Sequence, residues 1–290
     1  MAENGSVTPA FYVVPVLCLA LFALERAFPL RVPKRPLGGR LVTNLCVGAI
    51  ALLVVAIVVR PVAIAVLEET TEHSFGLIPQ LAMPPVAQWI AGFLLLDLSF
   101  YYWHRANHAW PFLWRFHNAH HIDPDLDVST NFRFHFVEIA LSAGFRAVQI
   151  ALIGGSPLMF IAYEVVFQAN TLFQHSNVRV PIGVERRLCF VLVTPRMHGI
   201  HHSRVRAENN ANWSSVFSWW DRLHGSLRLD IPQAEVDIGI AGYSRADDNR
   251  PVNVLAIPFR RQRDYWRDES DAIAVRTAEP RGQDARVMAE

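Results

Sequence analysis

The chain has 290 residues, of which 52% are hydrophobic and 18% are charged, and its formal net charge at pH 7 is +1. This near-neutral charge gives no reason to expect a nucleic-acid partner. The three cysteines, Cys18, Cys46 and Cys189, provide neither a disulfide framework nor a CxxC zinc site, so we expect reduced, structural thiols. The hydrophobic residues are concentrated in long runs, which predicts membrane-spanning helices.

The first apolar run covers about residues 10–29 and has Glu25 and Arg26 near its end. No basic segment precedes it and no cleavage site is evident, so we expect a retained helix and not a signal peptide. The second run, Leu41 to Val59, is long enough to cross a hydrocarbon core.

The third apolar run, about residues 86–102, leads directly into His104. It contains Asp97, which must face the protein interior because a charge exposed to lipid is costly. The fourth, about residues 137–172, is too long for one crossing and is interrupted by the turn residues 154–157, Gly-Gly-Ser-Pro. We therefore expect a helical hairpin in this region.

Charges between the runs orient them. Basic residues separate the first two runs: Arg31, Lys34, Arg35 and Arg40. Acidic residues follow the second run: Glu68, Glu69 and Glu72. The positive-inside bias places the basic connector in the cytoplasm and the acidic one on the opposite side. The histidines from His104 onward then all fall on the cytoplasmic side, whereas His73 falls on the other side and is excluded.

Three histidine motifs are the main chemical signal: residues 104–108 (HRANH), 117–121 (HNAHH) and 198–202 (HGIHH). Positions i, i+3 and i+4 share a face of a helix, so we expect each motif to direct its imidazoles at one point. Eight histidines exceed the four ligands of one zinc and suit two metal ions. Imidazoles with little thiolate favour Fe, Zn, Cu or Ni over Mg or Ca.

The order and spacing of these motifs resemble the fatty acid hydroxylase/sterol desaturase superfamily of membrane di-iron enzymes. The resemblance covers about residues 90–228. Flanking segments match as well: Ser129–His135 with Glu138, Phe173–Asn177, Asn212, and Trp220–Gly225. Phe136 stands where the family usually has proline. The resemblance implies two iron ions, O2 as cosubstrate, and ligands outside the three motifs.

His175 is the leading additional ligand that the resemblance implies, with core packing or helix capping as the alternative. The candidate metal ligands are His104, His108, His117, His120, His121, His175, His198, His201 and His202. Other polar residues near the motifs could hydrogen-bond the free ring nitrogens of these ligands. They are His135, Asp221, Asn212, Asn118 and Asp97. His135 could equally belong to a structural polar network, and Asp221 to a turn.

The predicted activity is O2-dependent hydroxylation, or desaturation, of a membrane lipid such as a sterol, a fatty acyl lipid or a sphingolipid. No flavin or nicotinamide fingerprint occurs, so the electrons must come from a separate donor of the cytochrome b5, ferredoxin or reductase type. Two other classes are a zinc-dependent membrane hydrolase and a histidine-rich metal transporter or sensor. The HExxH motif of many zinc hydrolases is absent, and a transporter would place its ligands near the bilayer midplane.

The expected fold is an all-α integral membrane protein with about four to five transmembrane helices and a cytoplasmic helical cap that holds the metal site. We expect N-terminal transmembrane helices in residues 1–85 and a catalytic domain in residues 86–258. The composition of residues 259–290 predicts a charged, mobile tail.

Overall fold

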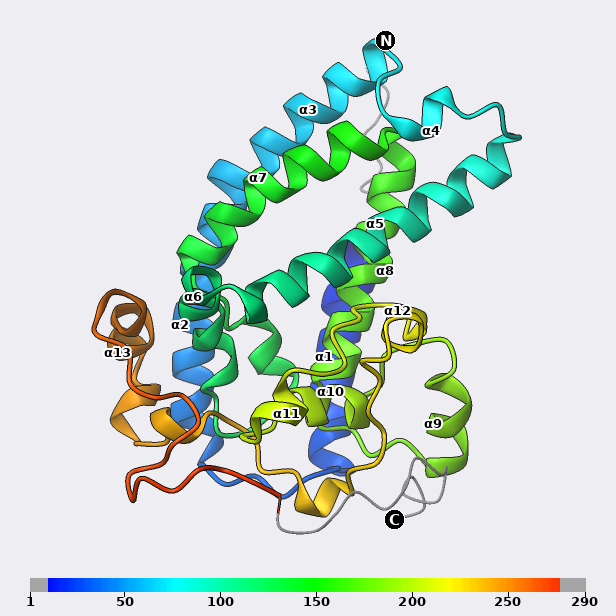
Figure 1. The fold of residues 1–290 in the computed structure, drawn as a ribbon. Coiled ribbons are helices and arrows are strands. Elements are labelled where there is room, and N and C mark those ends of the chain that lie inside the picture. Colours follow the sequence, from blue (N-terminus) through cyan, green and yellow to red (C-terminus); the bar gives the residue numbers. More distant parts are fainter. Residues whose placement is uncertain (1–9, 277–290) are drawn as a thin grey trace.

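The computed structural model describes residues 10–276, and within them all the regular secondary structure is helical. The only β-type pairs in this part of the chain are isolated bridges, such as that between Pro29 and Val178. This confirms the all-α prediction. Long helices extend toward one end of the molecule, and most of the short ones gather at the other end, which we call the cap (Figure 1).

The long helices supply the frame. They are α1 (Ala10–Ala27), α2 (Leu37–Val54), α3 (Arg60–Glu72), α5 (Pro85–Ala109), α7 (Phe136–Ile153) and α8 (Pro157–His175). A π-helical segment, η1 (Val55–Val59), joins α2 to α3. Helix α3 packs along α7, and α1 packs along α8 (Figure 1).

The short elements connect and cover this frame. The α-helical ones are α4 (Leu77–Gln80), α6 (Pro111–His121), α9 (Ile182–Leu188), α10 (Pro195–His201), α11 (Arg206–Asn209), α12 (Trp219–Leu223) and α13 (Pro251–Ala256). The 3-10 segments are η2 (Val128–Phe132), η3 (Gln233–Glu235), η4 (Ala241–Tyr243), η5 (Asp247–Asn249) and η6 (Ile257–Phe259).

Helices α7 and α8 form the hairpin that the sequence predicts. Helix α7 ends at Ile153, and the φ of 66° at the following Gly154 lies in the left-handed region that glycine tolerates. The side chain of Ser156 then accepts a hydrogen bond from the backbone of Met159, and Pro157 occupies the first turn of α8. A Cβ atom at Gly154 would clash with the carbonyl oxygen of Phe75, so this turn also packs closely against the α3–α4 connection.

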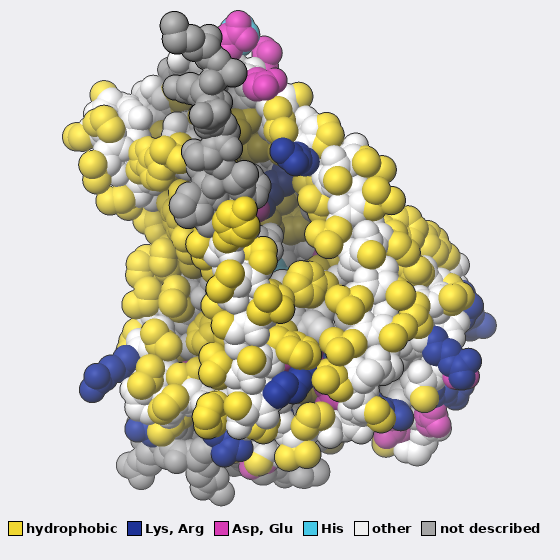
Figure 2. Space-filling model, turned by 180° about the vertical axis from the view of Figure 1, so that it is seen from behind, with side chains coloured by type: hydrophobic (Ala, Val, Ile, Leu, Met, Phe, Trp, Pro, Cys, Tyr) yellow, Lys and Arg dark blue, Asp and Glu magenta, His cyan; other side chains and the backbone are white. Residues whose placement is uncertain are grey.

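Two helical stretches are long and apolar enough to cross a membrane, Leu37–Gln80 and Phe136–Ile153. Only 6% of the most apolar window of the first is buried inside the protein, so its hydrophobic side chains face outward, as lipid-facing side chains would. On the side opposite to the view of Figure 1, hydrophobic side chains cover most of the surface, and basic ones gather mainly toward the cap (Figure 2). The number of crossings, about four to five, stays a prediction.

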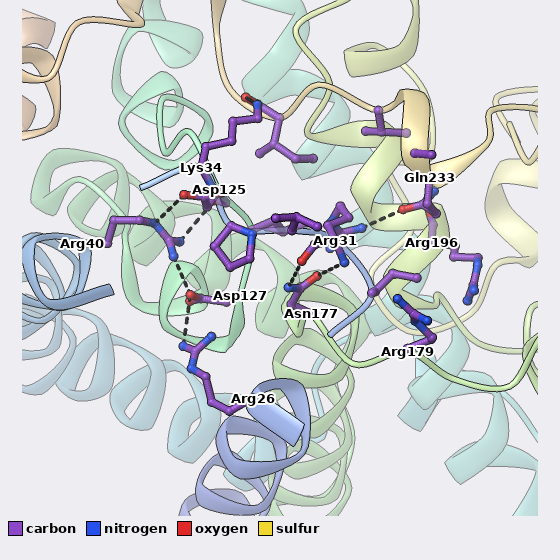
Figure 3. Close-up of a pocket in the computed structure, with 17 residues that line it drawn as sticks. Arg26, Arg31, Lys34, Arg40, Asp125, Asp127, Asn177, Arg179, Arg196 and Gln233 are labelled. Carbon is purple, nitrogen blue, oxygen red and sulfur yellow. Dashed lines mark hydrogen bonds and ion pairs between the residues drawn. The ribbon is translucent and has the colours of Figure 1, made fainter. Parts of the chain in front are cut away.

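A buried ion-pair network fixes the start of α2 to the loop that follows α6. Arg40 donates from Nε and Nη2 to the carboxylate of Asp123 at 2.8 and 2.9 Å. It also donates from Nη1 to Asp127 at 2.5 Å (Figure 3). Burial alone would raise the pKa of Asp123, but Arg40 and Arg133 outweigh it and lower the pKa to about 2. Because Asp123 follows His121 by two residues, the network holds the end of the second histidine motif.

The same network lines a pocket of about 550 Å³ in the cap, beside Arg31 and Arg179 (Figure 3). None of the residues lining this pocket is a histidine, so it is separate from the histidine motifs.

Part of the segment that we expected to form a mobile tail contacts the helical body. The ring of Trp266 stacks on that of Trp114 with centroids 6.0 Å apart, and Arg276 donates to the carboxylate of Glu208 at 2.6 Å. These contacts involve the stretch 259–276, and residues 277–290 lie outside the described residues.

Candidate metal centre

The nine histidines that the sequence selects as candidate ligands gather into two adjacent groups. Within each group the potential ligand atoms all lie within 4.8 Å of one another. The first group, which we call the five-histidine group, contains His104, His108, His117, His121 and His201. The second, the four-histidine group, contains His120, His175, His198 and His202.

The grouping follows the helical repeat. Histidines four residues apart enter the same group: His104 with His108 on α5, His117 with His121 on α6, and His198 with His202 at the end of α10. Adjacent histidines are separated by about 100° around a helix and therefore point to different groups.

Each HxxHH motif therefore contributes one histidine to the group that contains the other two histidines of the other motif. His120 belongs to the group built on α8 and α10, and His201 belongs to the group built on α5 and α6. The expectation that each motif directs all its imidazoles at one point is therefore wrong for these two motifs. The HxxxH motif does direct both of its histidines at one group.

Ring nitrogens in the four-histidine group converge as ligands of one ion would. The Nε2 atom of His175 lies 3.0 Å from that of His120 and 2.9 Å from that of His198, which in turn lies 3.1 Å from that of His202. Two imidazole nitrogens bound to one ion at about 2.0–2.1 Å stand roughly 3 Å apart. The donor set therefore fits a metal ion.

In the five-histidine group, buried nitrogens lack hydrogen-bond partners among the described residues. These nitrogens are both ring nitrogens of His108 and the Nε2 atom of His201. The Nε2 atoms of His117 and His121 lie 3.3 Å apart. Buried polar atoms without partners are rare in folded proteins, and a bound cation would satisfy these. This group fits a second metal ion.

Burial favours the neutral form of His120, His201 and His202, which is the form that binds a metal. Burial lowers the pKa of His201 to about 3. Burial, and secondarily repulsion from neighbouring histidines, lowers the pKa of His120 and His202 well below the ordinary value.

Backbone carbonyls orient three of the rings. In each case the Nδ1 atom lies at hydrogen-bond distance from a carbonyl oxygen, which leaves the Nε2 atom free for a metal. The pairs are His104 with Trp213 at 2.9 Å, His175 with Thr171 at 2.7 Å and His201 with Ala211 at 2.8 Å.

Two side chains that the sequence did not select contact the histidine groups. Glu138 of α7 accepts a hydrogen bond from the Nδ1 atom of His117 at 2.7 Å, and both side chains are buried. The side-chain amide of Asn209 in α11 lies 3.2 Å from the Nδ1 atom of His121. The position of Glu138 just after the Arg-Phe-His segment was a signal in the sequence, whereas Asn209 carries none.

Of the residues selected as hydrogen-bond partners for the ligands, Asp221 acts on the histidines indirectly, through the backbone of a neighbouring segment. Its carboxylate accepts hydrogen bonds from the backbone N–H groups of Trp213 and Ser214 at 2.9 and 3.0 Å. Because the carbonyl of Trp213 contacts His104, Asp221 fixes the segment that orients this ring. Asn118 is fully buried, and its side-chain amide has no partner among the described residues.

Three other selected residues bond elsewhere in the described part of the chain. Asp97 accepts from the indole of Trp220 at 2.7 Å. The amide of Asn212 donates to the carbonyls of Met197 and Arg228. His135 caps α7, accepting from Val137, and its Nε2 atom donates to the carbonyl of Leu255. Each of the three stabilises the scaffold and contacts no grouped histidine.

A cavity of about 320 Å³ opens beside both groups, between α2–η1, α5, α7 and α8. Histidines from the two groups form part of its wall: His104, His117, His120, His175 and His198. Aliphatic and aromatic side chains contribute much of the rest, among them Leu52, Phe100, Phe132 and Phe167. The cavity can therefore place an apolar chain against the histidine groups.

Fold and site together define a helical protein in which two histidine groups, each of which fits a metal ion, lie beside an apolar cavity. Residues 89–226 match the fatty acid hydroxylase family. This match supports the fatty acid hydroxylase/sterol desaturase superfamily, which the histidine motifs predict.

Three relatives illustrate the range of the family. The ornithine lipid hydroxylase OlsE of Rhizobium tropici is 32% identical over 55% of this chain and 47% of its own length. Human alkylglycerol monooxygenase is 30% identical over 49% of this chain and 31% of its own, and human cholesterol 25-hydroxylase is 28% identical over 47% and 49%. The chain thus spans between about a third and a half of the length of these relatives. No solved structure matches it significantly.

Proposed function

We propose that this protein is a membrane-embedded, O2-dependent lipid hydroxylase that holds two iron ions. The observation that carries this proposal is the pair of adjacent histidine groups in the wall of an apolar cavity. The relatives support a lipid substrate, because they are named as hydroxylases or monooxygenases of ornithine lipid, alkylglycerol and cholesterol. These names also favour hydroxylation over desaturation.

The nine grouped histidines would hold the metals. When bound and reduced, the two irons would supply an oxidant derived from O2 that is strong enough to attack an unactivated C–H bond. The overall reaction takes one C–H bond of the lipid, O2, two electrons and two protons to an alcohol and water. No amino-acid side chain is a strong enough oxidant for this reaction, so the protein contributes binding, orientation and the exclusion of water.

The residues of this chain perform those three tasks. Glu138 and the carbonyl of Trp213 set the ring orientation of His117 and His104 by bonding their Nδ1 atoms. Burial of the histidine groups excludes bulk water, and the side chains of Phe100 and Phe167 line the path along which an alkyl chain would lie.

The electrons would come from a separate protein of the cytochrome b5, ferredoxin or reductase type. We further propose a multi-pass membrane protein with the metal site on its cytoplasmic side, and a catalytic domain in residues 86–258. The basic connector between α1 and α2 lies at the cap end of the molecule with the histidine groups, in agreement with the positive-inside bias (Figure 1).

Isotope labelling tests this function. The purified, iron-loaded protein is incubated with a membrane lipid extract, a chemical reductant with a ferredoxin, and O2 labelled with heavy oxygen. We expect lipid products that contain one labelled oxygen atom. Products that take their oxygen from water instead would identify a hydrolase, and the absence of any product with every lipid class would contradict the proposal.

A further inference from the structure

A line of polar residues runs along one face of α8 into the cavity. Glu164, Gln168, Thr171 and His175 are spaced by four, three and four residues, so they share one face of the helix. All four line the cavity beside the histidine groups. An apolar membrane helix needs no such line for packing, because its neighbours are apolar as well.

Helix α7 carries a matching line. Glu138, Ser142 and Arg146 are spaced by four residues, and all three line the same cavity. Glu138 contacts His117 at one end of this line, and Arg146 forms an ion pair with Glu164 of α8 at the other. The two polar lines therefore begin at the histidine groups and meet at this ion pair.

The ion pair lies well away from the histidines. At 1.5 Å per residue, Arg146 is about 12 Å along α7 from Glu138, and Glu164 is roughly 16 Å along α8 from His175. The position of Arg146 is fixed, because its guanidinium lies over the ring of Phe100 at 4.5 Å and donates to Gln149 at 2.7 Å. The side chain of Glu164 is more open, with 41% of its surface exposed against 13% for Arg146.

The opposite wall of the cavity is apolar. It is formed by the α2–η1 segment: Gly48, Ala51, Leu52, Val55 and Val59. The cavity is therefore amphipathic along its length. In the face shown in Figure 2, basic side chains lie at the rim of a hollow whose surroundings are hydrophobic.

We propose that Arg146 and Glu164 form a binding site for the polar group of the lipid substrate. Charged residues on membrane helices are costly and usually serve a function. The guanidinium donates hydrogen bonds and the carboxylate accepts them, so the pair fits a neutral group that does both, namely a hydroxyl or an amide. This class costs less to bring to membrane depth than a charged headgroup.

This inference rests on the proposed function, since it takes the cavity as the lipid site. It adds to that function the position on the lipid at which the reaction occurs. A lipid anchored at the ion pair presents to the histidine groups a carbon roughly 12–16 Å from its polar group. The reaction therefore occurs far from the polar group and not on the carbon next to it.

The test compares two probes, a long-chain primary alcohol and the hydrocarbon of the same length, by native mass spectrometry of the detergent-purified protein. We expect wild type to retain the alcohol about tenfold more than the hydrocarbon, because hydrogen bonds to charged groups have this strength. The double variant R146M/E164M removes both charges together, so neither is left unpaired. It should retain both probes equally.

A matched control is R228M/D230M, which removes an ion pair in the cap, outside the cavity, and should keep the wild-type preference. If R146M/E164M does not fold, R146Q/E164Q replaces it and should show a clearly reduced preference. The proposal would be overturned if wild type showed no preference for the alcohol over the hydrocarbon. It would also be overturned if a variant without the two charges kept the wild-type preference and differed only in a lower unfolding temperature. Binding is read without turnover, so a protein that binds the alcohol but inserts no oxygen would refute the hydroxylase function alone.

Discussion

His120 and His121 are neighbours in the chain, yet their rings lie at 89° to each other and belong to different histidine groups. His201 and His202 are divided in the same way, with ring planes at 83°. Each HxxHH motif thus serves both groups. Because one helix positions histidines of both groups, the motifs also fix how the two groups sit relative to each other, and displacement of either helix would disturb both groups.

The division predicts different effects for two adjacent substitutions. His120→Ala leaves three histidines in its group, whereas His121→Ala leaves four in the other, which is a full set for a tetrahedral ion. We therefore expect His121→Ala to keep more metal during a titration with a chelator. The metal content of both variants, measured by mass spectrometry at each chelator concentration, checks this, and a larger loss in His121→Ala would contradict it.

Glu138 should tune the five-histidine group without binding a metal itself. Glu138→Gln removes the negative charge of the carboxylate beside the Nδ1 atom of His117 and should weaken metal affinity by about 10- to 100-fold. The measurement is metal retained against a chelator. Glu185→Gln is the matched control, because Glu185 is buried and pairs with Arg196 without touching a histidine. Equal retention in the two variants would remove this role from Glu138.

Asp221 should matter for stability and, through Trp213, for His104. Asp221→Ala leaves the N–H groups of Trp213 and Ser214 without their acceptor, which should lower the free energy of unfolding by about 2 kcal/mol or more. Metal affinity should fall as well, because the segment that orients His104 loosens. Asp221→Asn keeps one carbonyl acceptor and should therefore lower the midpoint of thermal unfolding in detergent less than Asp221→Ala does. Identical unfolding midpoints for the two variants would argue against this account.

Arg40 should be among the most sensitive positions for stability. Arg40→Met deprives the buried carboxylates of Asp123 and Asp127 of their ion pairs with Arg40 and should cost about 3–5 kcal/mol. Arg35→Met, at an exposed position just before α2, should change stability by less than about 0.5 kcal/mol. Thermal unfolding of the two variants in the same detergent gives the comparison. A small effect of Arg40→Met would show that the network is not what anchors the cap.

The sequence predicts the parts of this structure that follow from local periodicity. The spacing of His104 and His108 requires a shared helix face, and the turn at Gly154 requires a break between two helices. Eight of the nine candidate ligands were chosen on the same basis and His175 on the family resemblance, and the structure gathers all nine of them.

Contacts between distant segments could not be predicted in this way. Nothing in the local sequence indicates that Asn209 lies beside His121, or that the carbonyl of Ala211 meets His201. Backbone carbonyls carry no residue-type signal at all. Asp97 was selected as a partner of the ligands because of its charge in an apolar run, but its acceptor atoms meet Trp220, more than 120 residues away.

The central claim, that the two histidine groups hold two irons, is tested most directly by the metal content of protein freshly purified in detergent. Iron and zinc are measured together in wild type and in the double variant His120→Ala/His201→Ala, which removes from each group the ligand that comes from the other motif. We predict about two irons per chain in wild type and about one or fewer in the variant, because its five-histidine group keeps four histidines whereas its four-histidine group keeps three. Folded wild-type protein without bound metal, or a variant that keeps both ions, would contradict the account.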